Sequence, residues 1–244
     1  MFDGQRIAVI IPALNEEGAI GDVVRAIDRE LVDEVIVVDN GSADATVARA
    51  SEAGALVLHE PRRGYGSACL TGIRSARDAE LLVFLDGDGS DDPREIRAML
   101  DLMAERGLEL VIGSRVVGGT GRRHLTALQR FGNALTCALV RWFFGARFTD
   151  LGPFRAITRD ALARLEMADP DFGWTIEMQV KAAQRRLRVA EMPVSCRPRQ
   201  AGRSKVSGTL AGSWNAGRTI LGYVFAAKLS ELRRGRTSPN DARR

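Results

Sequence analysis

Short, continuously apolar runs alternate with helical patterns along the chain up to residue 115. Runs without polar alternation are typical of strands that are buried on both faces of a sheet. These runs predict strands over Ile7–Ile11, Glu34–Asp39, Ala55–Leu58, Glu80–Asp86 and Leu108–Gly113. The segments between them predict helices over Glu17–Arg29, Ala43–Ala53, Ser67–Ala76 and Pro93–Glu105. Such alternation indicates an α/β fold, in which right-handed crossovers join parallel strands.

The pattern becomes less regular after residue 115. It predicts a long amphipathic helix over Leu125–Phe144, a loop and short strand within Thr149–Arg159, a helix over Thr175–Arg186 and a strand over Arg188–Cys196. From residue 206 onward the chain contains Gly and Ser and then becomes basic. This composition predicts a C-terminal helix and a basic tail, with disorder over residues 233–244.

Polar side chains follow several predicted strands at the point where each strand ends. They are Asn15-Glu16, Asp39-Asn40, Asp86-Gly87-Asp88 and Ser114-Arg115. In sheets of this kind, ligands bind beyond the carboxyl ends of the strands. A single acidic strand end is often only a helix cap, whereas several polar ends on parallel strands converge on one rim. The sequence therefore predicts a ligand site at this rim.

Two carboxylates one residue apart form the sharpest local feature. Asp86 and Asp88 follow an apolar strand, and such a pair can share one hard divalent cation. Mg²⁺ and Mn²⁺ take carboxylate oxygens and complete their octahedron with phosphate oxygens and water. The alternative for this segment is a solvated turn. Asp91 and Asp92 come just before Pro93, so we expect both to cap the helix that begins there.

Two other segments have the composition of a nucleotide site. Asp39 can accept from a base N–H or a ribose hydroxyl, and Gly41 permits close backbone approach. The alternative is a strand-to-helix connection that Ser42 or Asp44 caps. In the run Arg62-Arg63-Gly64-Tyr65-Gly66, guanidinium groups beside small residues suit a loop against a diphosphate. Such an arginine pair taken alone is more often a solvated surface pair. The sequence contains neither a Walker A loop nor a GxGxxG fingerprint.

Charge is divided unevenly along the chain. The 244 residues carry a formal net charge of +4, but the segment from Arg197 to the C-terminus holds 11 basic and 2 acidic residues. The body is therefore mildly acidic and the C-terminal segment strongly basic. The basic stretches have little aromatic interleaving, which argues against a platform for single-stranded nucleic acid. We expect no nucleic-acid partner.

Cysteine usage and apolar runs indicate a cellular compartment. The three cysteines, Cys69, Cys137 and Cys196, are widely separated and form no CxxC pair, so neither a zinc site nor a disulfide framework is expected. The first apolar run ends in Pro12, unlike a signal peptide. No stretch has the roughly 18 uncharged apolar residues that span a bilayer. These features predict a protein of the reducing cytoplasm.

Five motifs in order resemble those of family 2 glycosyltransferases. They are PALNE (12–16), VVDNGSADAT (37–46), RRGYGSA (62–68), DGDGSDDP (86–93) and GSR (113–115). Asp150 with GPFR, Glu177 and the basic run 199–205 follow, and together they look most like the dolichyl- and polyprenyl-phosphate mannosyl- and glucosyltransferase branch. The resemblance covers roughly residues 5–210.

The resemblance implies a GT-A fold, with a Rossmann-like, mostly parallel central sheet flanked by helices. The glycosyltransferase domain would span residues 1–205, with a nucleotide-binding half over 1–115 and an acceptor half over 116–205. Residues 206–244 would form the C-terminal helix and tail.

The same resemblance assigns roles to individual residues. The donor nucleotide would be bound by Pro12, Ala13, Asn15, Glu16, Asp39, Gly41, Arg63, Gly64, Asp86 and Gly87. Mg²⁺ or Mn²⁺ would be bound by Asp86 and Asp88, and phosphates by Arg115, Arg199, Ser204 and Lys205. The catalytic candidates are Glu177, Asp150 and Asp88. The chain departs from the family at Asn40, where a second Asp is usual, and at Ser90, where relatives often carry Gln. Both departures argue against a third side-chain ligand to the metal.

The activity implied is a metal-dependent, inverting transfer of a hexose from a UDP- or GDP-sugar to a polyprenyl phosphate. Metal and arginines would stabilise the charge of the leaving diphosphate. A lipid monophosphate is largely dianionic at neutral pH and needs positioning more than deprotonation. A hydroxyl acceptor needs a base, for which Glu177 or Asp150 is the candidate. Glu177 can equally be a helix-surface carboxylate that pairs with Lys181.

Two alternatives to this activity stay open. The first is the same fold with a soluble hydroxyl acceptor. The second is a non-catalytic nucleotide-binding or membrane-interaction protein, which would bind nucleotide without enhancement by metal.

The amphipathic segment 122–147 has three interpretations. It packs on the sheet, forms a dimer face, or lies on a membrane with its arginines toward anionic headgroups and Trp142, Phe143 and Phe144 at the interface. Core packing is the commoner fate of such a helix, and the resemblance raises the membrane interpretation to equal standing. The expectations are therefore a cytoplasmic protein, peripheral contact with the inner face of the membrane, and a homo-oligomer as an open alternative.

Overall fold

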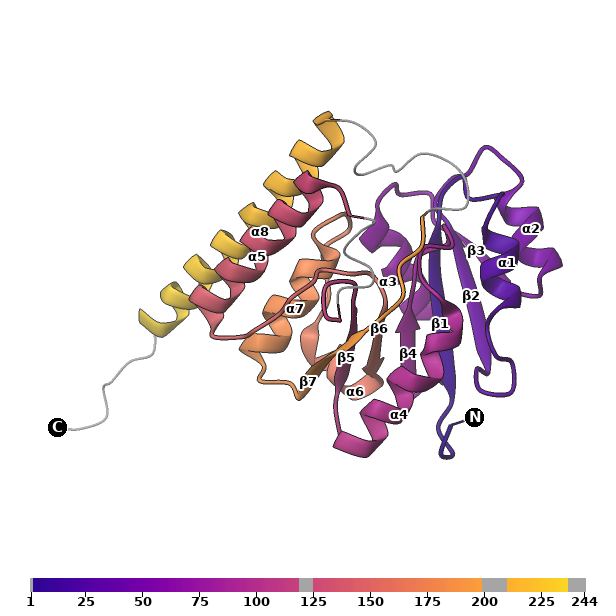
Figure 1. Ribbon diagram of the computed structural model, residues 1–244, viewed down its shortest axis with the longest axis horizontal. Coiled ribbons are helices and arrows are strands. Elements are labelled where there is room, and N and C mark those ends of the chain that lie inside the picture. The colour runs from indigo at the N-terminus through magenta and orange to yellow at the C-terminus, as the bar shows by residue number, and fades with distance from the viewer. Residues whose placement is uncertain (1, 119–124, 199–209, 237–244) are drawn as a thin grey trace.

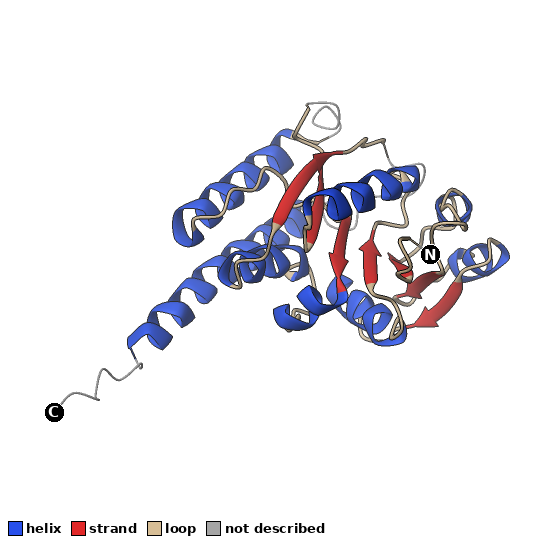
Figure 2. Ribbon diagram, turned by 90° about the horizontal axis from the view of Figure 1, so that it is seen from below, coloured by secondary structure: helices blue, strands red, loops and turns tan. Residues whose placement is uncertain are grey.

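One mixed sheet organises the computed structural model, which describes residues 2–118, 125–198 and 210–236. Within these residues the sheet has seven strands in the order β3-β2-β1-β4-β6-β5-β7 (Figure 1). The strands are β1 (Ile7–Ala13), β2 (Glu34–Asp39), β3 (Leu56–His59), β4 (Leu81–Phe84), β5 (Leu110–Ser114), β6 (Arg155–Thr158) and β7 (Val189–Pro193). Helices lie on both faces of this sheet (Figure 2).

The helices alternate with the strands as the sequence pattern predicted. They are α1 (Ile20–Arg25), α2 (Thr46–Glu52), α3 (Tyr65–Ser75), the short 3₁₀ helix η1 (Pro93–Glu95), α4 (Ile96–Arg106), α5 (Ala127–Phe144), α6 (Arg159–Leu165), α7 (Trp174–Gln184) and α8 (Leu210–Arg236). The predicted α/β class, with a mostly parallel sheet flanked by helices, is confirmed. None of the described helices is long and apolar enough to cross a membrane.

The packing of β1 explains its continuously apolar sequence. Successive side chains of a strand point to opposite faces of the sheet. Ile7, Val9 and Ile11 pack into the core on the face that α1 and α4 cover. Ala8 and Ile10 pack into the core on the opposite face, with residues of α3, α6 and α7. Because helices cover both faces, polar residues have no place along this strand until it ends.

The middle of the sheet differs from a simple series of parallel strands. β6 lies between β4 and β5 and pairs antiparallel with both. β5 therefore has no pairing with β4, and it pairs in parallel with β7 on its other side. The sequence pattern predicted a short strand here, but its hydrophobic run does not encode its partner or direction. One sheet thus contains strands from both expected halves, residues 1–115 and 116–205.

Two elements correct the sequence predictions. α6 (Arg159–Leu165) was not predicted, although Thr158 caps it by accepting from the backbone N–H of Ala161 at 3.3 Å. α8 continues to Arg236, so the disorder predicted from residue 233 is wrong for residues 233–236. Residues 233–236 are Arg-Arg-Gly-Arg, in which arginine favours helix and proline is absent. Residues 237–244 lie outside the described residues.

The two longest helices form a third layer beside the sheet. Thr126 caps the start of α5 and forms a capping box with Gln129. α8 packs against α5 and α7 through a core that contains Val140, Val180 and Val224. In Figure 1 the α5–α8 pair runs along the side of the molecule that is farthest from β3 and α2.

Candidate functional site

A cavity of about 340 Å³ opens at the carboxyl ends of β1, β2 and β4. Eight residues that the sequence nominated line it: Pro12, Ala13, Glu16, Arg63, Gly64, Asp86, Gly87 and Asp88. The pairing register brings these strand ends to one level, because Ala13 of β1 lies opposite Asp39 of β2. The remaining lining residues are Leu14, Asn40, Tyr65, Asp171 and Phe172.

The turn after β4 presents Asp86 and Asp88 to this cavity. The backbone N–H of Ser90 donates to a carboxylate oxygen of Asp88 at 2.8 Å, which orients that side chain. A Cβ atom on Gly87 would lie 3.1 Å from Ile20 and 3.3 Å from Ile11, so a side chain larger than hydrogen would crowd the core beneath the turn. Glycine between the two carboxylates therefore lets the turn pack closely on the core.

The residues at this turn fit a single divalent cation. No group of three or more His, Cys, Asp or Glu side chains with metal-binding geometry occurs among the described residues. Asp86 and Asp88 would supply two carboxylates to Mg²⁺ or Mn²⁺, and donor phosphate oxygens and water would be the remaining ligands. A site completed by the substrate matches this pair better than a cage made only of protein ligands.

Asp91 and Asp92 have different roles, and one differs from the prediction. Asp92 caps η1 by accepting from the backbone N–H of Arg94 at 3.2 Å, as predicted. Asp91 does not cap the helix: its carboxylate accepts from the backbone N–H of Asp86 at 3.2 Å and so closes the turn. Burial and the nearby charge of Asp88 raise the pKa of Asp91 to about 7, although the hydrogen bond from Asp86 opposes this shift. The prediction that Asp91 caps the helix is therefore wrong, because the backbone N–H of Asp86 engages its carboxylate.

Asp39 holds the loop that follows β2. Its carboxylate accepts from the backbone N–H of Ser42 at 3.0 Å and of Gly41 at 3.2 Å, and it lies 3.2 Å from Nδ1 of His59. Burial raises the pKa of this carboxyl, but the hydrogen bonds from Ser42, His59 and Gly41 outweigh burial and lower it overall. Asp39 is not among the residues that line the cavity. Its described contacts indicate that it shapes the wall of the site.

Asn40 connects the same loop to the segment before α3. Its side-chain amide donates to the carbonyl oxygens of Glu60 at 3.0 Å and Arg62 at 2.8 Å, and its oxygen accepts from the N–H of Gly64 at 2.8 Å. An ionised carboxylate has no hydrogen to donate. The departure from the usual second Asp therefore has a physical reason in this chain, which needs both donors at this position.

The segment from Arg63 to Tyr65 forms another wall of the cavity. A guanidinium nitrogen of Arg63 donates to the carbonyl oxygen of Gly41 at 3.0 Å, and Gly41 has a φ of +84°. Gly64 has a φ of +141°, and a Cβ atom there would lie 2.2 Å from the carbonyl oxygen of Pro170. Only glycine allows this approach, which packs the start of α3 against the loop that contains Pro170.

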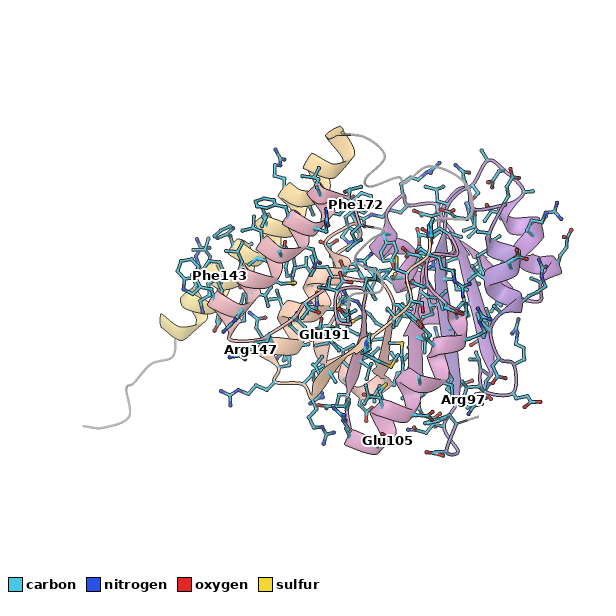
Figure 3. All side chains as sticks on the ribbon, viewed as in Figure 1. Arg97, Glu105, Phe143, Arg147, Phe172 and Glu191 are labelled. Carbon is cyan, nitrogen blue, oxygen red and sulfur yellow. The ribbon has the colours of Figure 1, made fainter. Side chains whose placement is uncertain are left out.

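That loop contributes Asp171 and Phe172, two lining residues that the sequence analysis missed. Phe172 lies near the upper ends of α5 and the sheet in Figure 3. Burial and the charge of Asp169 raise the pKa of Asp171. No strand ends at this loop, so the rule that located the other candidates did not apply. The turn residues in Asp169-Pro170-Asp171 were the available sign of an ordered loop.

Glu177 is buried and supports this loop from behind. Its carboxylate accepts from the backbone N–H of Ala168 at 3.0 Å and of Asp169 at 2.8 Å, and it lies 2.7 Å from the ammonium of Lys181. The pairing with Lys181 is therefore present, but Glu177 is only 2% exposed and does not lie on the surface. It is not among the cavity-lining residues.

Asp150 and Arg115 form a two-pronged ion pair at the edge of the site. The guanidinium nitrogens of Arg115 lie 2.7 and 2.8 Å from the two carboxylate oxygens of Asp150. The backbone N–H of Arg115 also donates to Asp150 at 2.8 Å. Burial lowers the pKa of Arg115, but the hydrogen bond and charge of Asp150 outweigh burial and raise it. Asp150 is fully buried and the Arg115 side chain is 22% exposed, and neither residue is among those that line the cavity.

Asn15 and Glu16 connect loops at this end of the sheet, whereas three other candidates lie outside the described residues. Asn15 has a φ of +51°, and its side-chain oxygen accepts from the N–H of Ala43 at 2.8 Å, which joins the loops after β1 and β2. The backbone N–H of Glu16 donates to Thr46 at 2.7 Å. The proposed phosphate residues Arg199, Ser204 and Lys205 lie outside the described residues, and nothing in the structure tests them.

A second cavity, of about 350 Å³, lies at the opposite edge of the sheet. Its walls include Arg147 and Glu191, which lie well away from Phe172 in Figure 3. Glu191 accepts from the backbone N–H of Thr149 at 2.9 Å and so anchors the loop after α5. The cavity lies away from the carboxyl strand ends, so the first cavity is the candidate functional site.

Comparison with known proteins identifies the family of this chain. Residues 8–166 match the family model described as glycosyl transferase family 2. An uncharacterized glycosyltransferase of Mycobacterium tuberculosis is 36% identical over 86% of this chain and 94% of its own length. Dolichyl-phosphate hexose transferase of Haloferax volcanii is 32% identical over 91% of this chain and 96% of its own length.

Solved structures of glucosyl-3-phosphoglycerate synthase from Mycobacterium tuberculosis are also similar. Two of them, one with Mg²⁺ and UDP and one with Mn²⁺, UDP and glucosyl-3-phosphoglycerate, align with a TM-score of 0.73 and 27% identity. The alignments cover 92% of this chain and 79% and 80% of those chains. The fold is the GT-A glycosyltransferase fold, as the motif resemblance implied.

Proposed function

This chain belongs to glycosyltransferase family 2, and we propose that it transfers a hexose from a nucleoside diphosphate sugar to a polyprenyl phosphate, with inversion at the anomeric carbon. The observation that carries this proposal is the Asp86-Gly87-Asp88 turn, which faces the strand-end cavity together with Arg63. A UDP-sugar is the first donor to test, because similar solved structures bind UDP, and a GDP-sugar is the second.

Each wall of the cavity has a distinct task in this mechanism. Asp86 and Asp88 would hold Mg²⁺ or Mn²⁺ against the diphosphate, and the bound cation would stabilise the charge that develops on the leaving group. Arg63 lies on the same cavity and would add a guanidinium to the diphosphate. The loops that Asp39 and Asn40 order would enclose the base and ribose. Arg115, which Asp150 directs, would meet a phosphate of the donor or acceptor.

The site favours an acceptor that needs little deprotonation. Both acidic residues that the sequence nominated as bases, Asp150 and Glu177, are buried and bound by neighbouring donors. A phosphate monoester is largely dianionic at neutral pH and can attack without a base. Dolichyl-phosphate hexose transferase, which is similar over nearly all of this chain, has a name that indicates such an acceptor. An acceptor anchored in a bilayer would place the enzyme at the inner face of the membrane.

A soluble hydroxyl acceptor is the second candidate. The similar solved structures include complexes with phosphoglyceric acid and glucosyl-3-phosphoglycerate. Asp171 would be the base for such an acceptor, because it lines the cavity and burial raises its pKa. Glu177 would then act by holding the loop that carries Asp171.

A substrate panel tests the proposal. The purified protein is incubated with labelled UDP-glucose, UDP-galactose or GDP-mannose, with Mn²⁺, Mg²⁺ or EDTA, and with polyprenyl phosphate or 3-phosphoglycerate. We expect glycolipid formation that requires metal, and no product on phosphoglycerate. Product on phosphoglycerate alone would establish the second candidate, and no turnover of any donor with either acceptor would contradict both.

The variant Asp171→Asn separates the two acceptors independently. With a lipid phosphate acceptor, kcat should change by less than about threefold, because no proton is removed from the nucleophile. With a hydroxyl acceptor, the loss of a base should lower kcat by about 100-fold or more. Asp160→Asn on α6 is the control, since it removes an acidic side chain that does not line the cavity.

A further inference from the structure

We propose that the exposed side of the α5–α8 pair docks onto an anionic lipid bilayer. This α5–α8 face consists of Leu128, Phe131, Leu135, Trp142, Phe225 and Leu229, all large apolar residues that are exposed. The inference extends the proposed function by naming the surface through which the enzyme would reach a lipid acceptor. It also has its own physical basis, which is separate from the reaction.

The spacing of these residues puts them on one side of α5. Leu128, Phe131 and Leu135 are three and four residues apart, so they lie above one another on the helix surface, and Trp142 continues the same line two turns later. Phe131 is 66% exposed and Trp142 is 79% exposed. The inward side of α5 is already covered, because Val140 is buried in the core with α7 and α8. The chain thus has a second apolar side on a helix whose packing needs only one.

Aromatic contacts join the two helices into one surface. The ring of Trp142 stacks on Phe143 at 5.4 Å between centroids, and Phe143 meets Phe225 of α8 edge-on at 5.4 Å. The ammonium of Lys228 donates to the carbonyl oxygen of Phe143 at 2.9 Å, which fixes α8 beside the end of α5. Figure 3 shows Phe143 at the outer side of the pair. The rings therefore form a continuous patch over two helices.

The positive charge of the two helices favours anionic lipid over a second copy of the chain as the partner of this surface. α5 and α8 together contain seven Lys and Arg residues and one acidic residue, Glu231. Arg130 and Arg141 are exposed, and within the described residues neither forms an ion pair with a carboxylate. A second copy of the chain would bring the same positive charge to the interface, so the two copies would repel each other. Anionic headgroups supply the opposite charge, and aromatic and leucine side chains insert below them.

The position of the pair connects this surface to the site. In Figures 1 and 3 the upper ends of α5 and α8 lie at the same edge of the sheet as Phe172, which lines the strand-end cavity. Docking along the two helices would therefore bring the cavity rim close to the bilayer surface. A membrane-anchored phosphate could then reach the cavity without leaving the headgroup layer.

Vesicle flotation of the full chain tests this proposal without donor or acceptor, so it can fail separately from the proposed function. We expect the protein to float with vesicles of phosphatidylcholine and phosphatidylglycerol, less with phosphatidylcholine alone, and less as NaCl is raised. Phe131→Ser and Trp142→Ser should each weaken the partition about tenfold or more. Val47→Ser, which removes an apolar residue that is 42% exposed on α2, should leave it unchanged.

A charge series completes the test. Arg130→Ser and Arg141→Ser should each weaken partition into phosphatidylglycerol vesicles about fivefold, whereas Arg106→Ser on α4 should not. Thermal unfolding, with and without UDP and Mn²⁺, should be the same for all variants and the wild type, which shows that the fold and the donor site are intact. Failure of the wild type to float with anionic vesicles would overturn the proposal. So would a dimer in light scattering that Phe131→Ser and Trp142→Ser dissociate.

Discussion

The turn after β4 and the region behind the cavity both contain acidic residues, but the fold uses them differently. Asp86 and Asp88 line the cavity. Asp150 and Glu177 are buried outside it, where Arg115 binds the first, and two backbone amides and Lys181 bind the second. Asp86 and Asp88 are therefore placed to meet a ligand in the cavity, whereas the carboxylates of Asp150 and Glu177 are held by neighbouring donors. Elsewhere the same residue type positions a neighbour.

The largest effect is expected at the turn. Asp86→Ala and Asp88→Ala each remove a carboxylate from the proposed cation site, so turnover should fall by on the order of 100-fold or more. Steady-state transfer assays with Mn²⁺ measure this loss. Asp101→Ala on the exposed side of α4 is the matched control and should retain full activity. Activity near the wild-type level in both cavity variants would contradict the proposed cation site at this turn.

Asp150→Asn should affect stability strongly. The substitution leaves the partly buried guanidinium of Arg115 without its carboxylate, which should lower the free energy of unfolding by about 3 kcal/mol. Urea unfolding followed by tryptophan fluorescence measures it. If Asp150 were instead a catalytic base, the variant would lose turnover while its unfolding curve stayed at the wild-type midpoint.

The substitution Asn40→Asp tests whether the hydrogen bonds of Asn40 support the donor site. The new carboxylate cannot donate to the carbonyls of Glu60 and Arg62, so we expect a loss of about 2 kcal/mol in stability and a higher KM for the donor. Asn133→Asp is the matched control in the other half, because the amide of Asn133 donates to Thr149 at 2.7 Å. It should lose stability without raising the donor KM. Equal donor KM values in both variants would argue against a role for Asn40 at the site.

The smallest effect concerns pH. The folded state lowers the pKa of Asp39 below its ordinary value of 3.8, so this carboxylate stabilises the protein at higher pH. The contribution, about 1 kcal/mol, is lost as the pH falls through the lowered pKa. The difference in unfolding free energy between the wild type and Asp39→Asn should therefore be constant near neutrality and shrink below pH 3.8. A difference that persists at lower pH would show that Asp39 acts without its charge.

The parts of the site that the sequence predicted lie on strands that are parallel neighbours in the sheet. β1, β2 and β4 pair in parallel as neighbours, so residues at the ends of their apolar runs meet at one rim. β6 inserts antiparallel between β4 and β5, and no hydrophobic pattern encodes that insertion. The loop with Asp171 and Phe172 reaches the cavity by packing against Gly64, a contact between segments more than 100 residues apart. Such contacts depend on how the elements assemble.

The sequence by itself determined the α/β class, and it pointed to the rim with the candidate site and to the carboxylate pair there. These follow from local physics, since apolar runs become buried strands and polar residues appear where strands end. Only the tertiary structure decided which acidic residues face the cavity and which are held by neighbours. It also decided that Asn40 bridges two loops and that one side of α5 remains exposed. Those outcomes depend on distances between residues that the chain brings together only when it folds.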